Sequence, residues 1–251
     1  MDSLSRFRRT PSQADLLRSQ IASVNYRVAV INRSATLDDH EVRATVAALQ
    51  TQVHRDFAPV WGIDADLVCV PRSSPPPADA WEVVLVDDPD VPYAMGSSDL
   101  TATGLPRAKV FARLAAQIEG GWTLTTSHML LELLANPRAN LTVLRASSDT
   151  AGRLYAYSIC TPCSGNANSY EIDGVRVSDF VFPAWFEAFR EPRSARFDQC
   201  NRIVEPFEVL PDSYALVCHV QHEGWRPIFR EQSSSPAMDT APRKTKKPRV
   251  S

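Results

Sequence analysis

Residues 125–137 constrain this chain more than any other segment, because they read as a short helix that is apolar on nearly every side. Its only strongly polar side chains are His128 and Glu132, which lie four residues apart and therefore project from one helical face. A helix that is hydrophobic all round is expected to be buried, and a buried carboxylate needs a partner. The segment therefore predicts a buried helix whose polar pair is either a metal site or an internal hydrogen-bonded pair.

Composition places the chain among ordinary globular proteins. Of its 251 residues, 44% are hydrophobic and 22% are charged, which is usual for a packed domain. No apolar run approaches the roughly 20 residues that a membrane-spanning helix needs, and the charged start lacks the apolar stretch of a secretory signal. The five cysteines are scattered and odd in number, unlike a disulfide framework. We therefore expect a cytoplasmic protein without membrane association.

Charge and composition divide the chain into three parts. Residues 1–24 are polar and short of large apolar groups, so we expect a flexible N-terminal arm. Residues 231–251 carry five basic and two acidic residues among Ser and Pro, which predicts a disordered basic tail. Residues 25–230 are then a single domain. The chain outside the tail is acidic, because the tail is basic while the whole chain has a net charge of −2. Nucleic-acid binding is not expected of the domain. The basic tail is interpreted as solubilising, with contact to nucleic acid or to an acidic partner as the alternative.

Hydrophobic periodicity predicts strands around one long helix in the first half of the chain. Apolar residues recur at spacings of three and four between Val42 and Val60, which indicates an amphipathic helix. Thr36 and Asp39 form a candidate capping box before it. Runs of β-branched and aromatic residues predict strands at 26–31, 66–71, 81–86, 108–114, 154–159, 203–209, 214–220 and 225–229.

The stretch from residue 170 to residue 189 contains a hairpin signal and an aromatic cluster. Asp173 and Gly174 separate the short runs 170–172 and 175–177, which predicts a hairpin with a type I′ turn. A short helix is predicted at 183–189, starting on its proline. The aromatic cluster comprises Phe180, Phe182, Trp185, Phe186 and Phe189. It predicts core packing, with a substrate cleft as the alternative.

Several blocks of the chain carry a resemblance to a known family. They are residues 57–62 (Phe-Ala-Pro-Val-Trp-Gly), 96–99, the 125–137 helix, 155–163, 177–180 (Val-Ser-Asp-Phe) and 183–186 (Pro-Ala-Trp-Phe). Together they resemble a family of uncharacterised bacterial and phage proteins with zincin-like character. In that family the helix reads Ser-His-Glu-Leu-Leu-Glu-Met-Leu before an Asp-Pro pair, and the later block reads Cys-Asp-Pro-Cys-Glu.

The resemblance implies an α+β, zincin-like fold over residues 25–230. Such a fold has a mixed twisted sheet, a long helix packed on it, and a buried helix that carries the metal ligands. The expected order is strand, long helix, strands, edge strand and metal-site helix. His128 and Glu132 match the family's ligand positions, zinc is the implied metal, and residues 160–163 should lie near both side chains.

This chain departs from the family where the chemistry needs carboxylates. Met129 stands in place of a glutamate, and Asn136 in place of the aspartate before the proline. Thr161 and Ser164 replace acids in the later block. A zinc hydrolase needs a general base, and catalytic zinc takes three protein ligands. We therefore expect weak zinc binding or none, and hydrolytic activity that is lost or severely reduced, so no catalytic residue is assigned.

Three functional hypotheses follow. The first is a metallopeptidase-like protein that is catalytically impaired because Met129 replaces the general base. The alternative is a metal-free, non-catalytic binding or scaffold protein on the same fold, with a peptide or protein as its ligand. The third is a thiol-redox protein that works through Cys160 and Cys163, since a Cys-x-x-Cys pair can have a depressed thiol pKa.

The cysteine pair has further interpretations. A thioredoxin-like site needs the motif to open a helix, but Gly165 and its polar neighbours predict a loop. A structural zinc site would need Cys200, Cys218, His219 or His222 to complete the ligand set, and residues 219 and 222 point to opposite sides of a strand. Two ordinary buried thiols are the simplest interpretation.

Overall fold

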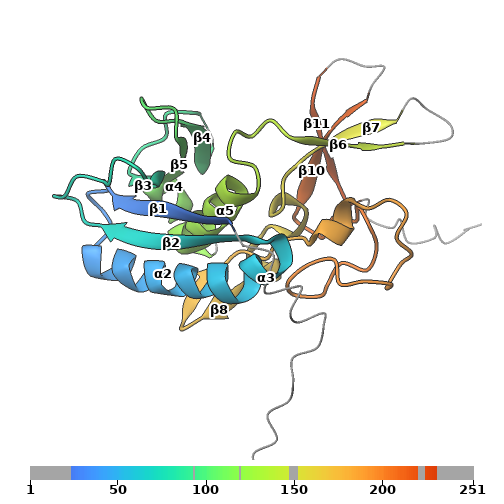
Figure 1. Ribbon diagram of the computed structural model, residues 1–251, viewed down its shortest axis with the longest axis horizontal. Helices are drawn as coiled ribbons and strands as arrows, with labels where there is room; N and C mark the ends of the chain where they lie inside the picture. Colours follow the sequence, from blue (N-terminus) through green and yellow to red (C-terminus); the bar gives the residue numbers. More distant parts are fainter. Residues whose placement is uncertain (1–23, 93, 119, 147–151, 220–223, 231–251) are drawn as a thin grey trace, which may run out of the picture.

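A five-stranded mixed sheet forms the centre of the first half of the molecule (Figure 1). The computed structural model describes residues 24–92, 94–118, 120–146, 152–219 and 224–230. The strand order is β2-β1-β3-β5-β4. The strands are β1 (Val24–Asn32), β2 (Ile63–Val70), β3 (Trp81–Val86), β4 (Gly96–Leu100) and β5 (Pro106–Phe111). All neighbouring pairs are parallel except β4 with β5, so β4 is an antiparallel strand at one edge.

One long helical segment packs on the sheet. It consists of α2 (Asp39–Thr51), a π-helical turn η1 (Gln52–Phe57) and α3 (Ala58–Trp61), and it ends where Gly62 adopts φ 68°. This confirms the predicted amphipathic helix. The predicted capping box is wrong, because the N-cap is Asp38, whose carboxylate accepts from the His40 N–H.

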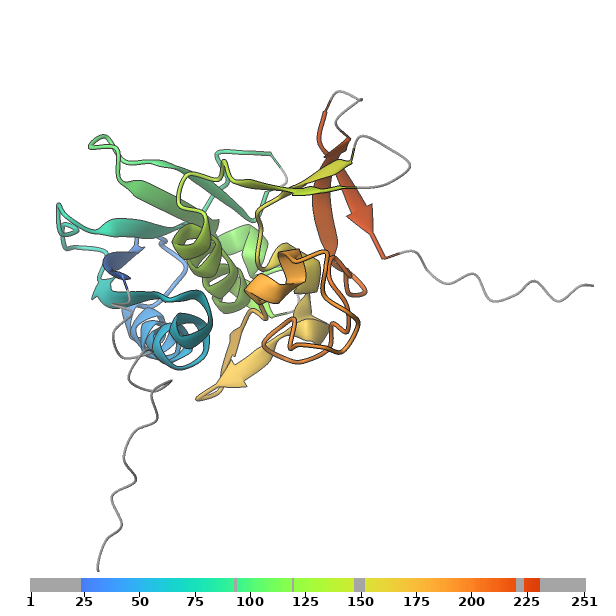
Figure 2. The same ribbon diagram turned by 45° about the vertical axis from the view of Figure 1, so that its right-hand side comes forward.

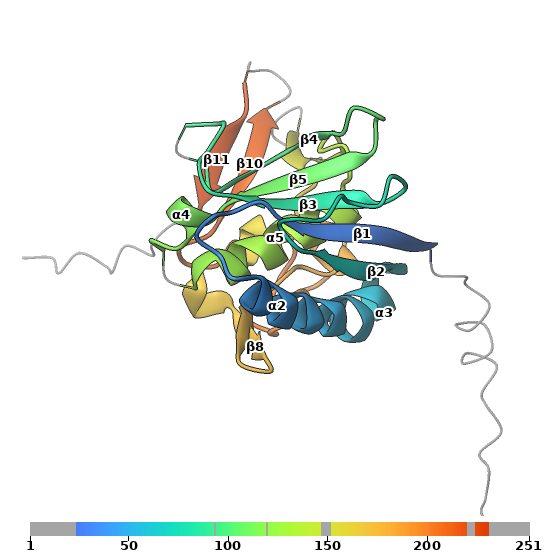
Figure 3. The same cartoon turned by 90° about the vertical axis from the view of Figure 1, so that its left-hand side faces the viewer.

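The predicted buried helix is α5 (Gly121–Ala135), which follows the short α4 (Ala112–Ala115). Figure 3 shows α2 and α5 on the same side of the sheet. Val28 and Val30 of β1 belong to the same core cluster as the leucines of both helices, whereas Ala29 and Ile31 pack in a small cluster on the opposite face. The burial of both faces explains why β1 is apolar without alternation.

The second half adds a smaller antiparallel sheet, which lies apart from the first (Figure 2). Its strand order is β11-β10-β7-β6. The strands are β6 (Thr142–Arg145), β7 (Arg153–Ala156), β10 (Tyr214–His219) and β11 (Arg226–Phe229). The hairpin is β8 (Tyr170–Ile172) with β9 (Val175–Val177), and the 3-10 turns are η2 (Thr161–Cys163), η3 (Asn166–Asn168) and η4 (Pro183–Phe186).

The hairpin turn was predicted correctly, because Asp173 and Gly174 both have positive φ, 51° and 76°. The strand predicted at 203–209 is wrong. The Ile203 N–H donates to the Asp198 carboxylate, and Phe207 has φ 60°, so this run is an irregular loop. The strands β4 and β6 were not predicted: β4 contains no β-branched residue, and β6 is a four-residue strand with only Thr142 and Val143 of that kind.

The architecture is mixed α and β, with a mixed sheet and few helices, and is compatible with the expected α+β class. The predicted tail (231–251) and all but the last residue of the predicted arm (1–24) lie outside the described residues. Within the described part of the chain, no helix combines the length and apolar character that a bilayer crossing requires.

Candidate functional site

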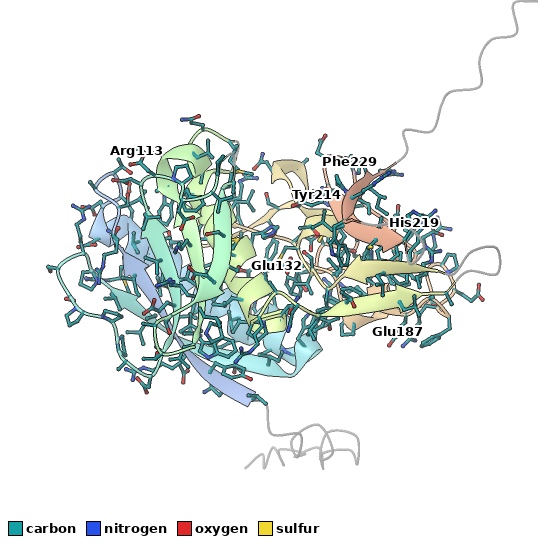
Figure 4. All side chains as sticks on the ribbon, turned by 90° about the horizontal axis from the view of Figure 1, so that it is seen from above. Arg113, Glu132, Glu187, Tyr214, His219 and Phe229 are labelled. Carbon is teal, nitrogen blue, oxygen red and sulfur yellow. The ribbon has the colours of Figure 1, made fainter. Side chains whose placement is uncertain are left out.

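His128 and Glu132 lie one turn apart on α5, as their spacing predicts. The His128 Nε2 and Glu132 Oε1 atoms are 4.0 Å apart, and the two side chains keep 24% and 16% of their surface exposed. Figure 4 shows Glu132 in the middle of the molecule, where α5 meets the later segments of the chain. The pair is therefore largely enclosed, and it reaches solvent from one side of the helix.

The carboxylate of Glu132 is held by the segment that follows β7. Its Oε1 atom accepts hydrogen bonds from the Ser158 hydroxyl at 2.5 Å and from the Cys160 N–H at 2.8 Å. Thr161 donates in turn to the Ser158 hydroxyl oxygen at 2.9 Å. The partner that a buried acid needs is thus supplied by the protein itself. The same contacts place residues 160–163 beside α5, where the resemblance predicts them.

The surroundings of His128 favour the neutral form of its imidazole. Burial lowers the pKa of its imidazole below the usual value, and the nearby Glu132 carboxylate opposes this only in part. A neutral imidazole can accept or donate one hydrogen bond, and it can bind a metal through a ring nitrogen.

The donor set around this pair is incomplete for catalytic zinc. Among the described residues, no three side chains of His, Cys, Asp or Glu converge as a metal-binding group. Asn136 and Thr161 make structural contacts. Asn136 donates to the Tyr157 carbonyl, and Thr161 bonds Ser158. Ser164 donates to the Thr161 carbonyl. The residues present therefore do not fit a three-ligand zinc site.

Cys160 and Cys163 are buried thiols that point at backbone carbonyls. Burial, above all, raises the pKa of both well above the usual value for cysteine. Reactive redox thiols instead have lowered pKa values, because the thiolate is the nucleophile. Their surroundings therefore disfavour the thiol-redox hypothesis. Of the further candidate zinc ligands, His222 lies outside the described residues.

Met129 packs beneath the edge strand β4. A Cβ atom added to Gly96 would lie 2.8 Å from the Met129 sulfur and 2.8 Å from the Lys109 carbonyl oxygen. The close approach of α5 to the edge strand thus depends on a glycine at this position. The Met129 thioether lines a cavity between β4 and α5.

That cavity has a volume of about 430 Å³ and lies between β4, α5 and two later loops. Met95, His128 and Met129 line one part of it, and Asn166, Asp212 and Tyr214 line another. A second cavity of about 240 Å³ lies at the far end of β4, between residues 98–100 and residues 137–140. The two cavities thus accompany the edge strand along its length.

The aromatic cluster after the hairpin is mainly core. Phe180 and Trp185 are fully buried, and the Trp185 indole donates to the Glu208 carbonyl. Phe189 is the exception, with 76% of its surface exposed. Asn166, Asp212 and Tyr214 were missed by sequence reasoning. Asn166 begins η3, whereas Asp212 and Tyr214 lie just before and at the start of β10, so no local spacing joins Asn166 to the other two.

Comparison with known proteins identifies no relative. No family model, no curated protein and no solved structure matches this chain. The arrangement of the side chains around His128 and β4 is therefore the basis for a functional assignment.

Proposed function

We propose that this chain is a zincin-like protein that no longer hydrolyses peptides and instead binds an extended peptide along β4. The order of elements supports the fold. Strand β1 is followed by the long helix, β2, β3, the antiparallel edge strand β4, β5 and the helix with His128 and Glu132. This is the order that the family resemblance implies.

The free edge of β4, with a cavity at each end, is the observation that carries the proposal. Among the described strands, β4 pairs only with β5. Phe111 N–H bonds the Met95 carbonyl, and Thr101 N–H bonds the Leu105 carbonyl. Because antiparallel ladders alternate, the amide groups of Gly96, Ser98 and Leu100 face the free edge. Such an edge can accept a peptide as an added strand, and the cavities can receive its side chains.

Loss of hydrolysis follows from three features of the site. Met129 has no group that can take a proton from water. The donor set offers two side chains where catalytic zinc takes three. One oxygen of the Glu132 carboxylate is already engaged by Ser158 and Cys160. Binding of a peptide by β4 needs none of the missing groups.

The proposal is tested with a set of fluorescent, acetylated and amidated peptides. Binding is measured by anisotropy in EDTA, and cleavage is followed by mass spectrometry with EDTA or with zinc. We expect peptide binding that EDTA leaves unchanged, and no cleavage in either buffer. Chelator-sensitive cleavage by the wild-type protein would overturn the proposal, as would the absence of any peptide binding.

A matched pair of variants tests the role of β4. Ser98→Pro removes an outward N–H without touching the bonds to β5, and a proline is tolerated on an edge strand. We expect it to weaken peptide binding about tenfold, which corresponds to about 1.4 kcal/mol and to one lost hydrogen bond. Ser98→Ala keeps the outward N–H and is the matched control, which should bind more tightly than Ser98→Pro. Equal peptide affinities of the two variants would show that the peptide does not bind along β4.

In a second candidate function the protein binds zinc. The short distance between His128 and Glu132 favours this function. A catalytically impaired metallopeptidase-like protein would bind zinc weakly through these two side chains. Elemental analysis should then find substoichiometric zinc that chelator removes and that His128→Ala abolishes. Stoichiometric zinc that survives His128→Ala would place the metal elsewhere.

A further inference from the structure

The larger cavity beside β4 has two chemically different walls. One wall comes from α5 and from the segments that precede β4 and α5, and its apolar side chains are those of Met95, Ile118, Leu124 and Met129. These side chains offer a surface for an unbranched hydrocarbon stem. The floor between the walls contains Thr125 and His128 of α5.

The opposite wall presents hydrogen-bond acceptors. Asn166 lines the cavity, and its Oδ1 atom is buried without a hydrogen-bond partner. Asp212 brings a carboxylate from the loop before β10, and Tyr214 brings a hydroxyl. A buried acceptor without a partner costs free energy that a donor on a ligand would recover. The wall therefore favours a ligand that donates hydrogen bonds.

The charge around the cavity has one sign. None of its described lining residues is a lysine or an arginine, and Asp212 is acidic. Glu132 does not line the cavity, but its Oε1 atom lies 4.0 Å from the Nε2 atom of His128, which does. A cation in the cavity is attracted by both carboxylates, whereas an anion would be repelled by both.

We infer that this cavity binds the side chain of a lysine or arginine in the peptide that lies along β4. The apolar wall takes the methylene stem, and the acceptor wall takes the charged head. Gly96, the first residue of β4, lines the cavity, so a peptide along this strand would pass next to it. The inference rests on the proposed function, since β4 presents the peptide.

Four fluorescent peptides that differ only at the central residue test the inference. That residue is lysine, arginine, norleucine or glutamate. Norleucine supplies nearly the stem of lysine without its charge. We expect the lysine and arginine peptides to bind at least tenfold more tightly than the norleucine peptide, and the glutamate peptide to bind more weakly than norleucine.

Variants of the acceptor wall separate charge recognition from strand addition. Asp212→Asn should reduce the preference for lysine over norleucine, and asparagine tolerates the φ of 58° at this position. Asn166→Ala should do the same. Asp173→Asn, in the exposed β8–β9 turn, is the matched control and should keep the preference. Ser98→Pro should weaken all four peptides alike and leave their order unchanged.

The possible outcomes distinguish the two proposals. If no peptide binds, the proposed function fails. If the lysine and norleucine peptides bind equally, or if the glutamate peptide binds best, the inference is overturned while peptide binding stands. A lysine preference that survives both Asp212→Asn and Asn166→Ala also overturns it, because the charge is then recognised elsewhere. Circular dichroism spectra and melting curves establish that each variant is folded.

Discussion

The single residue Glu132 shows how a candidate metal ligand can serve the fold instead. Its Oε1 atom accepts from Ser158 and Cys160, so Glu132→Ala would leave two enclosed donors without an acceptor. Each such donor costs about 1–3 kcal/mol. We expect Glu132→Ala to lower the free energy of unfolding by at least about 2 kcal/mol in EDTA. Glu132→Gln, which keeps a carbonyl oxygen, should cost less. Urea denaturation measures both.

Glu187→Ala provides the control at this scale. Glu187 pairs with Arg190 at the surface, and such pairs contribute little. Its substitution should change the free energy of unfolding by less than about 1 kcal/mol. If Glu132→Ala is neutral in EDTA and destabilising only when zinc is present, then Glu132 is a metal ligand and its hydrogen bonds are secondary.

At the scale of the element, the π-helical turn η1 connects the long helix to the rest of the core. Gln52 is fully buried there. Its amide donates to the Tyr170 hydroxyl and the Ser178 carbonyl, and its oxygen accepts from Ser127. Insertions of this kind redirect side chains within a helix. Gln52 thereby links η1 to α5 and to the hairpin.

We expect Gln52→Ala to destabilise the protein by about 2–4 kcal/mol, because several buried partners lose their bonds at once. Thr51→Ala, one residue earlier, removes only a hydroxyl that bonds within the helix. It should change the free energy of unfolding by less than about 0.5 kcal/mol. Chemical denaturation measures the free energy of unfolding of the two variants. Equal stabilities would show that the turn is not anchored by Gln52.

At the scale of the whole molecule, a buried pair of acids makes stability depend on pH. Asp179 and Asp198 are both fully buried. Burial first, and then the Asp198 carboxylate, raise the pKa of Asp179 to about 8. Between about pH 4 and pH 8 the folded protein keeps a proton that the unfolded chain has released. Asp179 therefore contributes stability that is lost as the pH rises through this range.

Asp179→Asn should remove this dependence. Asparagine can accept from the Phe180 and Cys200 N–H groups as Asp179 does, and it does not titrate. Relative to the wild type, the variant should gain stability as the pH rises, by at most about 1.4 kcal/mol per pH unit. Urea denaturation at pH 5, 7 and 9 measures the difference, with Asp173→Asn as the control. Parallel profiles for wild type and variant would contradict the prediction.

The sequence by itself determined the elements whose patterns are local. The apolar run of β1, the spacing from Val42 to Phe57 and the Asp173-Gly174 turn each predict a structure that forms. The same is true of α5 and of the i, i+4 spacing of His128 and Glu132. These signals depend on periodicity and on backbone preference, which neighbouring residues determine.

Only the tertiary structure decided what surrounds those residues. Glu132 meets Ser158 and Cys160 across more than 25 residues of sequence, and the cavity near β4 is completed by Asn166 and Asp212. The strand predicted at 203–209 does not form for the same reason, since the Ile203 N–H donates to the Asp198 carboxylate. Such contacts depend on how distant segments pack, and no local pattern in the sequence encodes that packing.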